Sequence, residues 1–260
     1  MRIRSCAELF AVYKRSTIQA VPALGDYRSV WDRKPALRVV YSDFYDRMTA
    51  CCVPGRTLEI GGGIGNLKQR IDNVLATDVQ FAHWLDCVAD AQHLPFAAGS
   101  LDNIVMVDVL HHIEFPVRFF VEADRVLRTH GRIIMVEPAI TWLSTVFYRL
   151  LHHEPVIMSA DPLLSGSPDP NRDPYDSNQA IPTLIATRDR SRFHQLFPRL
   201  HIVRTEWFSL TAYPLTGGFK SWSLLTEGLA RGLLAVERRI ESLVGRALSF
   251  RMLLVIEKSE

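Results

Sequence analysis

Short apolar runs alternate with amphipathic stretches between residues 55 and 138 of this chain. The apolar runs predict five strands, at residues 56–60, 74–77, 87–89, 103–107 and 132–136. Helices are predicted at 66–71 and 116–127, with His130-Gly131 as a glycine cap at the end of the second. Continuously apolar strands separated by helices are typical of a parallel sheet that is covered on both faces. The pattern therefore predicts an α/β fold.

The pattern changes after residue 138. Residues 161–176 are rich in Pro, Asp, Gly and Ser, which predicts a long loop of the kind that serves as a lid or a binding loop. The remaining predicted elements are a helix at 187–197, a strand at 201–208, a helical stretch at 222–248 and a last strand at 251–257. Because the N-terminal segment looks helical, we expect a helical cap at 1–53, a main domain at 54–260 and an insertion or substrate lid within it at 139–200.

Composition and charge narrow the class of protein. Of the 260 residues, 48% are hydrophobic and 22% charged, as in an ordered globular chain. The net charge is only +2 and there is no long basic run, so no electrostatic argument favours a nucleic-acid partner. The four cysteines form no C-x-x-C pair, which argues against a zinc site or a disulfide framework. The N-terminus makes a poor signal peptide and no apolar run reaches the ~18 residues of a membrane span, so a cytoplasmic protein is expected.

Four glycines follow the first predicted strand in the stretch TLEIGGGIGNLK, residues 57–68, and their missing Cβ atoms let a ligand approach the backbone. The dinucleotide fingerprint G-x-G-x-x-G/A fails because Asn66 stands at its last position, and no Gly-Lys-Ser/Thr completes a phosphate loop. The carboxylate of Glu59 beside the turn disfavours a pyrophosphate and suits a ligand with positive charge. S-adenosylmethionine, which carries a sulfonium and an ammonium but no phosphate, is such a ligand.

Three further blocks follow the glycines in order: VLATDVQ at 74–80, VADAQHLPF at 88–96 and LDNIVMVDVLHHI at 101–113, with RVLRTHGRIIMVEP after them. Each block alone is equally well explained as a turn or a helix cap. Together they resemble the class I S-adenosylmethionine-dependent methyltransferases, in the small-molecule branch called methyltransferase type 11. The resemblance is close over residues 55–138 and loose elsewhere. It implies a Rossmann-like fold with a seven-stranded, mostly parallel sheet whose last strand is antiparallel.

The resemblance also implies which residues hold the cofactor. Asp78 would accept hydrogen bonds from the ribose hydroxyls, and Asp90 would lie next to the adenine amine. The full set of implied cofactor-binding residues is Glu59, Gly61, Gly63, Gly65, Asp78, Val79, Asp90, Ala91 and Asp108.

Candidate catalytic residues follow the fourth and fifth strands, at the sheet edge where open α/β folds bind their ligands. His111 and His112 follow the fourth strand, and Glu137 ends the fifth. Histidine suits the removal of a proton from an alcohol or phenol near neutral pH. In related O-methyltransferases a histidine at this place is often the base and a carboxylate after the fifth strand orients it. We therefore predict that His111 or His112 is the base, with Glu137 as its partner; the alternative, that one histidine packs under the adenosine, stays open.

No metal is expected. The sequence His152-His153-Glu154 lacks the H-E-x-x-H spacing and is better explained as a solvated helix end. The acidic residues of the 161–176 loop lack the calcium-binding pattern.

The acceptor is expected to be a small organic molecule, methylated on an oxygen of a sugar, a lipid-linked group or a secondary metabolite. The fourth strand lacks the N/D/S-P-P-Y/F/W motif of nucleobase amine methyltransferases, and Cys87, which we expect to be buried on the third strand, is misplaced for a nucleophile. Two alternatives are an NAD(P)-dependent oxidoreductase and a non-catalytic regulator that binds S-adenosylmethionine. Aromatic residues of the cap, the insertion and the segment near 211–222 are candidates for the pocket, although most are expected in the core: Trp142, Tyr148, Tyr175, Trp207, Tyr213, Phe219 and Trp222.

Residues 228–248 form an amphipathic pattern. At helical spacing the apolar stripe contains Leu229, Leu233, Val236, Ile240, Val244 and Ala247. Such a helix lies on a membrane surface or packs its stripe on the sheet, and we favour packing. The oligomeric state and the identity of the acceptor are not predicted by the sequence.

Overall fold

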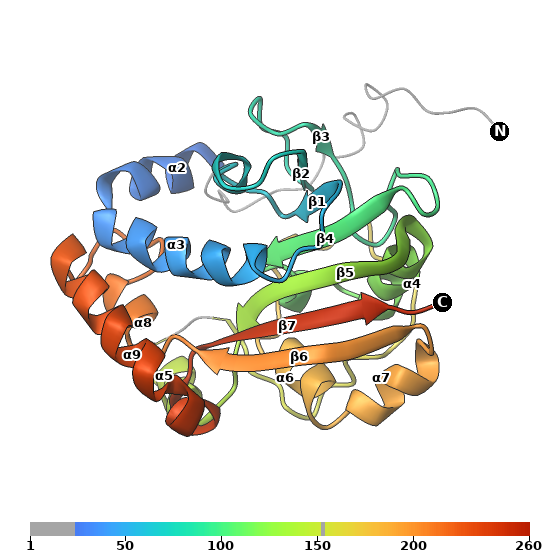
Figure 1. Cartoon of the computed structure of the whole chain (residues 1–260). Coiled ribbons are helices and arrows are strands. Elements are labelled where there is room, and N and C mark those ends of the chain that lie inside the picture. Colours follow the sequence, from blue (N-terminus) through green and yellow to red (C-terminus); the bar gives the residue numbers. More distant parts are fainter. Residues whose placement is uncertain (1–23, 152–153) are drawn as a thin grey trace.

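The computed structural model describes residues 24–151 and 154–260, and its centre is a seven-stranded sheet in the order β3-β2-β1-β4-β5-β7-β6 (Figure 1). The strands are β1 Thr57–Ile60, β2 Val74–Asp78, β3 Cys87–Val88, β4 Leu101–Val107, β5 Leu127–Pro138, β6 Leu200–Phe208 and β7 Arg251–Lys258. Strands β1 to β5 are parallel to one another, and β7 lies antiparallel between β5 and β6. The predicted fold class, including the antiparallel last strand, is confirmed.

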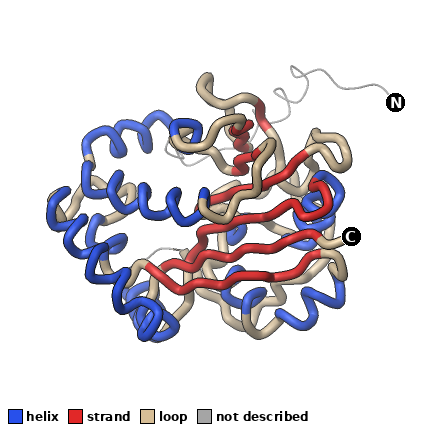
Figure 2. The backbone as a smooth tube through the Cα atoms, in the orientation of Figure 1, coloured by secondary structure: helices blue, strands red, loops and turns tan. Residues whose placement is uncertain are grey.

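Helices cover both faces of the sheet, as Figure 2 shows. The helices are α2 Leu24–Arg33, α3 Pro35–Thr49, α4 Pro116–Val126, α5 Trp142–Leu151, α6 Ile181–Ala186, α7 Arg190–Leu196, α8 Ala212–Thr216 and α9 Glu227–Leu248, with 3-10 turns η1 Leu67–Gln69 and η2 Leu110–His112. Successive residues of a central strand enter opposite cores: in β5, Ile133 packs with α4, α6 and α7, whereas Ile134 packs with α3, α8 and α9. This period of two explains why the strands are apolar on both faces.

Two local predictions near the sheet are wrong. The helix expected at 66–71 is only the 3-10 turn η1. The glycine cap expected at His130-Gly131 is absent, because α4 ends at Val126 and Leu127 already pairs with Leu101 of β4. Gly131 is needed for another reason: a Cβ there would lie 3.0 Å from the carbonyl oxygen of Asp102. Helix α4 therefore ends where the strand pairing of β5 begins, four residues before Gly131.

Cys87 is exposed, so its predicted burial is wrong. It lies on β3, a two-residue strand at the edge of the sheet that no helix among the described residues covers. The aperiodic loop predicted at 161–176 holds no helix or strand, as expected. Predictions for the N-terminus before residue 24 and for His152-His153 fall outside the described residues.

The helical N-terminal segment is described from residue 24 onward. Helix α3 buries Leu37, Val40 and Phe44 in the same core as β5, β7 and α9. The division at residue 53 stays a prediction. No helix in the described part of the chain is long and apolar enough to span a bilayer.

Candidate active site

The glycine loop leaves β1 with three glycines in left-handed conformation: φ is +68° at Gly61, +46° at Gly63 and +76° at Gly65. An added Cβ would come within 2.3 Å of Val109 at Gly61 and within 2.8 Å of Trp84 at Gly65. At Gly63 it would meet no atom closer than 3.8 Å. The protein's own packing thus explains the outer two glycines, while Gly63 faces open space that a ligand can use.

Asp78, the last residue of β2, is aimed at this loop. Its carboxylate accepts hydrogen bonds from the backbone N–H of Gly63 at 3.0 Å and of Gln80 at 2.9 Å. Burial raises the pKa of Asp78, and these two hydrogen bonds oppose that rise. Val79 follows and is exposed. The structure therefore brings together Gly63 and Asp78, two residues that the sequence predicted to share one cofactor.

Glu59 lies buried beneath the loop, and one oxygen, Oε2, has no hydrogen-bond partner among the described residues. Burial, followed by the charge of Asp78, raises the pKa of Glu59 to about 8. A buried carboxyl group of this kind is stabilised by a cation and destabilised by a phosphate. Because only the turn η1 follows the loop, the site also lacks the helix N-terminus that favours a pyrophosphate. The buried carboxyl group of Glu59 and the charge of Asp78 fit a positively charged ligand such as S-adenosylmethionine.

In the third segment predicted to bind the cofactor, Asp90 is accessible to a ligand but the side chain of Ala91 is not. Asp90 is exposed, and its Oδ1 accepts the backbone N–H of Gln92 at 2.8 Å, which leaves Oδ2 for another contact. Ala91 packs in the hydrophobic core between the sheet and α4. Because its methyl group is buried in this core, any role of Ala91 toward a ligand is limited to its backbone.

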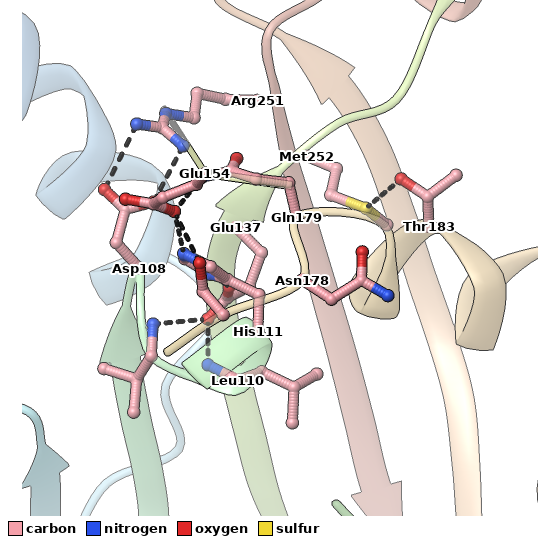
Figure 3. Close-up of polar contacts among 12 residues, drawn as sticks. Asp108, Leu110, His111, Glu137, Glu154, Asn178, Gln179, Thr183, Arg251 and Met252 are labelled. Atoms are coloured by element: carbon pink, nitrogen blue, oxygen red, sulfur yellow. Dashed lines mark hydrogen bonds and ion pairs between the residues drawn. The ribbon is translucent and has the colours of Figure 1, made fainter. Parts of the chain in front are cut away.

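Asp108 is held by a residue that sequence analysis missed. Its carboxylate accepts two hydrogen bonds from the buried Arg251 of β7, at 2.7 and 3.2 Å (Figure 3). The Arg251 guanidinium also lies 4.0 Å from the centre of the Tyr213 ring. Asp108 has φ +57°, a conformation that few non-glycine residues adopt. The only signal in the sequence was that a basic residue, Arg251, begins the apolar strand predicted at 251–257.

We expect Asp108→Asn to lower the free energy of unfolding by about 1–3 kcal/mol, because the Arg251 charge loses its charged partner in a buried setting. Denaturant unfolding measures this. The matched control is Asp161→Asn, which removes the partner of the exposed Arg192 and should cost no more than about 0.5 kcal/mol. Unchanged stability together with weaker binding of S-adenosylhomocysteine would instead assign Asp108 to the cofactor.

His111 and Glu137 form the pair that the sequence predicted. The His111 ring is buried, and its Nδ1 lies 2.7 Å from Oε2 of the fully buried Glu137 (Figure 3). The other oxygen of Glu137 accepts the backbone N–H groups of Val109 at 2.9 Å and Leu110 at 2.7 Å. One carboxylate therefore fixes both the start of η2 and the orientation of the imidazole.

Glu154 completes this arrangement and was not recognised from the sequence. Its Oε2 lies 3.5 Å from Nε2 of His111 and also accepts a hydrogen bond from the side-chain amide of Gln179. Burial lowers the pKa of His111, but the hydrogen bonds to Glu137 and Glu154 outweigh burial and raise this pKa to about 9. The residue that looked like part of a solvated helix end thus faces the catalytic candidate.

His112 differs from its neighbour. Burial, and then the charge of His111, lower the pKa of His112 to about 4, so its ring is neutral at pH 7. Its Nδ1 is buried without a hydrogen-bond partner among the described residues. Ligand atoms of His111, His112 and Glu154 lie within 4.8 Å of one another, close enough to hold a metal ion, which the sequence did not suggest. A metal would have to displace the proton that His111 holds up to about pH 9.

The predicted aromatic residues do not gather in one pocket. Tyr175, from the long loop, reaches the site, where its hydroxyl accepts a hydrogen bond from Gln80 at 2.6 Å. Tyr148 is buried against Phe250, whereas Trp142 is exposed. Of these aromatic residues, Trp207 lines a surface cavity of about 230 Å³, and none lines a second surface cavity of about 400 Å³.

Comparisons with known proteins agree with this fold. Residues 58–135 match the family described as a methyltransferase domain. A solved S-adenosylmethionine-dependent methyltransferase from Archaeoglobus fulgidus is 14% identical, with a TM-score of 0.52 over 86% of this chain and 94% of that chain, which shows a shared fold. An uncharacterized 37.1 kDa protein in transposon TN4556 of Streptomyces fradiae is 35% identical over 71 residues, 27% of this chain and only 19% of that protein's length. Residues 58–135 thus match a methyltransferase domain, and the chain as a whole shares its fold with a solved S-adenosylmethionine-dependent methyltransferase.

Proposed function

We propose that this protein transfers the methyl group of S-adenosylmethionine to an oxygen atom of a small organic acceptor. The observation that carries the cofactor assignment is the buried Oε2 of Glu59, which has no partner among the described residues and lies beneath a glycine loop whose Gly63 N–H donates to Asp78. A sulfonium or ammonium group near Glu59 offsets the cost of burying its charge. In this proposal Asp78 accepts hydrogen bonds from the ribose hydroxyls, and Asp90 accepts one from the adenine amine.

The acceptor half of the site is assigned to the ends of β4 and β5. When bound, S-adenosylmethionine supplies an electrophilic methyl group on its sulfonium. His111, in its neutral form, accepts the proton of the acceptor hydroxyl at Nε2 while the C–O bond forms and the C–S bond breaks. Glu137 holds the Nδ1 proton at 2.7 Å and stabilises the imidazolium that results. The 3.5 Å separation between Nε2 and Glu154 leaves this nitrogen without a tight partner, so a hydroxyl can replace that contact.

The chemistry of the lining supports a hydroxyl-bearing acceptor. Glu154 and Gln179 place hydrogen-bonding groups next to Nε2 of His111, and Tyr175 adds a hydroxyl and a ring. These groups suit a sugar, a lipid-linked sugar or a polar secondary metabolite. The lining gives no reason to prefer a nucleobase.

We expect S-adenosylhomocysteine to raise the melting temperature of the purified protein and NADH to leave it unchanged. Ligand at about 100 times its dissociation constant contributes about 2.7 kcal/mol, which is readily detected. Transfer of labelled methyl groups to a panel of hydroxylated acceptors then tests turnover. A shift with NADH alone would favour the oxidoreductase, and a shift with the adenosyl ligand but no transfer to any acceptor would favour the non-catalytic regulator.

A further inference from the structure

Helix α9 packs on the sheet with a different face from the one that its apolar stripe suggested. The buried residues are Ala230, Leu234, Glu237 and Gly245. A Cβ at Gly245 would lie 2.4 Å from the carbonyl oxygen of Trp207, so the small residue permits close contact with β6. The Glu237 carboxylate accepts the backbone N–H groups of three successive residues at the start of α8, Leu210, Thr211 and Ala212. The close contact of Gly245 with β6 and the hydrogen bonds of Glu237 at the start of α8 therefore determine which face of α9 is buried.

The apolar stripe of α9 is consequently left at the surface. Leu229, Val236 and Ile240 are all exposed, and Leu243 is 83% exposed. Positions three and four residues apart lie side by side on a helix, so Val236, Ile240 and Leu243 form one continuous row, and the half-buried Leu233 connects Leu229 to it. The expectation that the predicted stripe would be covered by the sheet is wrong for Leu229, Val236 and Ile240, whereas Leu233 and Val244 of that stripe are half-buried.

Helix α5, which packs beside α9, carries a second exposed row. Trp142, Val146 and Leu150 follow one another at intervals of four residues, and Trp142 is 72% exposed. The opposite side of α5 packs inward, where Phe147 contacts Phe250 next to the C-terminal end of α9 with ring centres 5.1 Å apart. We call the seven exposed apolar residues the α5/α9 surface: Trp142, Val146, Leu150, Leu229, Val236, Ile240 and Leu243.

Unpaired arginines flank the α5/α9 surface. Arg239 lies three residues from Val236 and four from Leu243, and Arg246 lies three from Leu243. Neither of them, nor Arg149 on α5, has an acidic partner in the described parts of the chain. The two other arginines that project from α9 are neutralised, Arg231 by Glu227 and Arg238 by Asp43. The excess positive charge is thus concentrated next to the apolar rows.

We propose that the α5/α9 surface binds an anionic phospholipid bilayer. Its apolar side chains enter the boundary between headgroups and acyl chains, and Arg149, Arg239 and Arg246 contact the anionic headgroups. Trp142 has the amphipathic ring that is favoured at this depth. The inference does not depend on methyl transfer; if both hold, a lipid-linked acceptor is favoured among the proposed ones.

The test is flotation of the full chain with vesicles of phosphatidylcholine alone and of phosphatidylcholine mixed with phosphatidylglycerol. We expect binding to the anionic vesicles, weakening as salt is added. The double variant Val236→Glu/Leu243→Glu should abolish binding, and Arg239→Ala/Arg246→Ala should weaken it about thirtyfold. Val121→Glu places one glutamate on α4, at an apolar site as exposed as Val236, and should bind like the unmodified protein; the single variant Val236→Glu, its match in charge, should bind more weakly.

Three outcomes would overturn the proposal: no binding of the unmodified protein to anionic vesicles, unchanged binding of Val236→Glu/Leu243→Glu, or an oligomer that this variant dissociates without any vesicle binding. The last would assign the surface to a second copy of the chain. Melting with S-adenosylhomocysteine checks that each variant is folded. Because that melting shift is independent of vesicles, failure of the membrane proposal and failure of the proposed function give different results.

Discussion

Replacing His111 with asparagine should reduce the rate of methyl transfer about 100- to 10,000-fold and leave binding of S-adenosylhomocysteine unchanged. The side-chain amide of asparagine reaches the position of Nδ1, so the hydrogen bond to Glu137 is kept. What is lost is Nε2, the atom that accepts the proton of the acceptor hydroxyl. Single-turnover transfer of a labelled methyl group measures the rate, and calorimetry with S-adenosylhomocysteine measures the affinity.

His112→Asn is the matched control, since His112 lies in the same 3-10 turn, η2, and its low pKa makes it a weak base. We expect a much smaller loss of rate in this variant. If His112→Asn lost more of the rate than His111→Asn, the base would be His112 and not His111. If His111→Asn lost the cofactor as well as the rate, His111 would be a packing residue under the adenosine.

The pH profile gives a second readout of the same role. The base form of His111 is the deprotonated one, and its pKa in the free protein is raised to about 9. The ratio kcat/KM should therefore rise about tenfold per pH unit below about 9 and level off above it. Glu137→Gln keeps an oxygen for the N–H groups of Val109 and Leu110 but removes the charge that raises this pKa, so the break should move to lower pH. Its amide N–H also donates to Nδ1, which places the proton of the neutral ring on Nε2, so the plateau should be lower as well. A profile identical in both proteins would contradict the pairing.

Asp78→Ala should weaken binding of S-adenosylhomocysteine by a factor of about 100 to 10,000. Two hydrogen bonds from ribose hydroxyls to a carboxylate contribute about 1.5–3 kcal/mol each, which corresponds to this range. Calorimetric titration with S-adenosylhomocysteine measures the loss. The control Asp72→Ala removes the same charge from an exposed position in the turn before β2 and should leave the affinity unchanged.

Asp78 also holds the N–H of Gly63, so a looser loop would weaken binding without any contact to the ribose. Asp78→Asn separates the two explanations, because its carbonyl oxygen can still accept that N–H while the charge is lost. A large loss of affinity in both variants supports the ribose contact. Full affinity in Asp78→Asn would limit Asp78 to positioning the loop.

The parts of the site that follow single strands were predictable. Glycines 61, 63 and 65 and the acidic residue Asp78 are placed by the ends of β1 and β2, and Glu137 by the end of β5. Parallel strands bring their carboxyl ends to the same edge of a sheet, so residues far apart in sequence converge there once the strands are identified. The pairing of His111 with Glu137 follows from this rule and was correctly expected.

Partners that arrive from outside the parallel strands were missed. Glu154 reaches His111 after α5, and Arg251 reaches Asp108 from an antiparallel strand 143 residues later. Neither carries a motif, because an ion pair needs only proximity and complementary charge, and these are set by how the C-terminal half folds back on the sheet. The same reason explains why Glu154 looked like part of a solvated helix end.

Side-chain periodicity and backbone sterics account for most of the local conformations, namely the apolar strands, the glycine turn and the longer amphipathic helices. Which groups meet depends instead on how these elements pack against one another. Helix α9 shows the difference most clearly, since its periodicity predicted a helix and an apolar stripe, yet the small Gly245 and the capping Glu237 were buried instead. Periodicity describes one element, whereas burial depends on the shape and hydrogen-bonding needs of its neighbours.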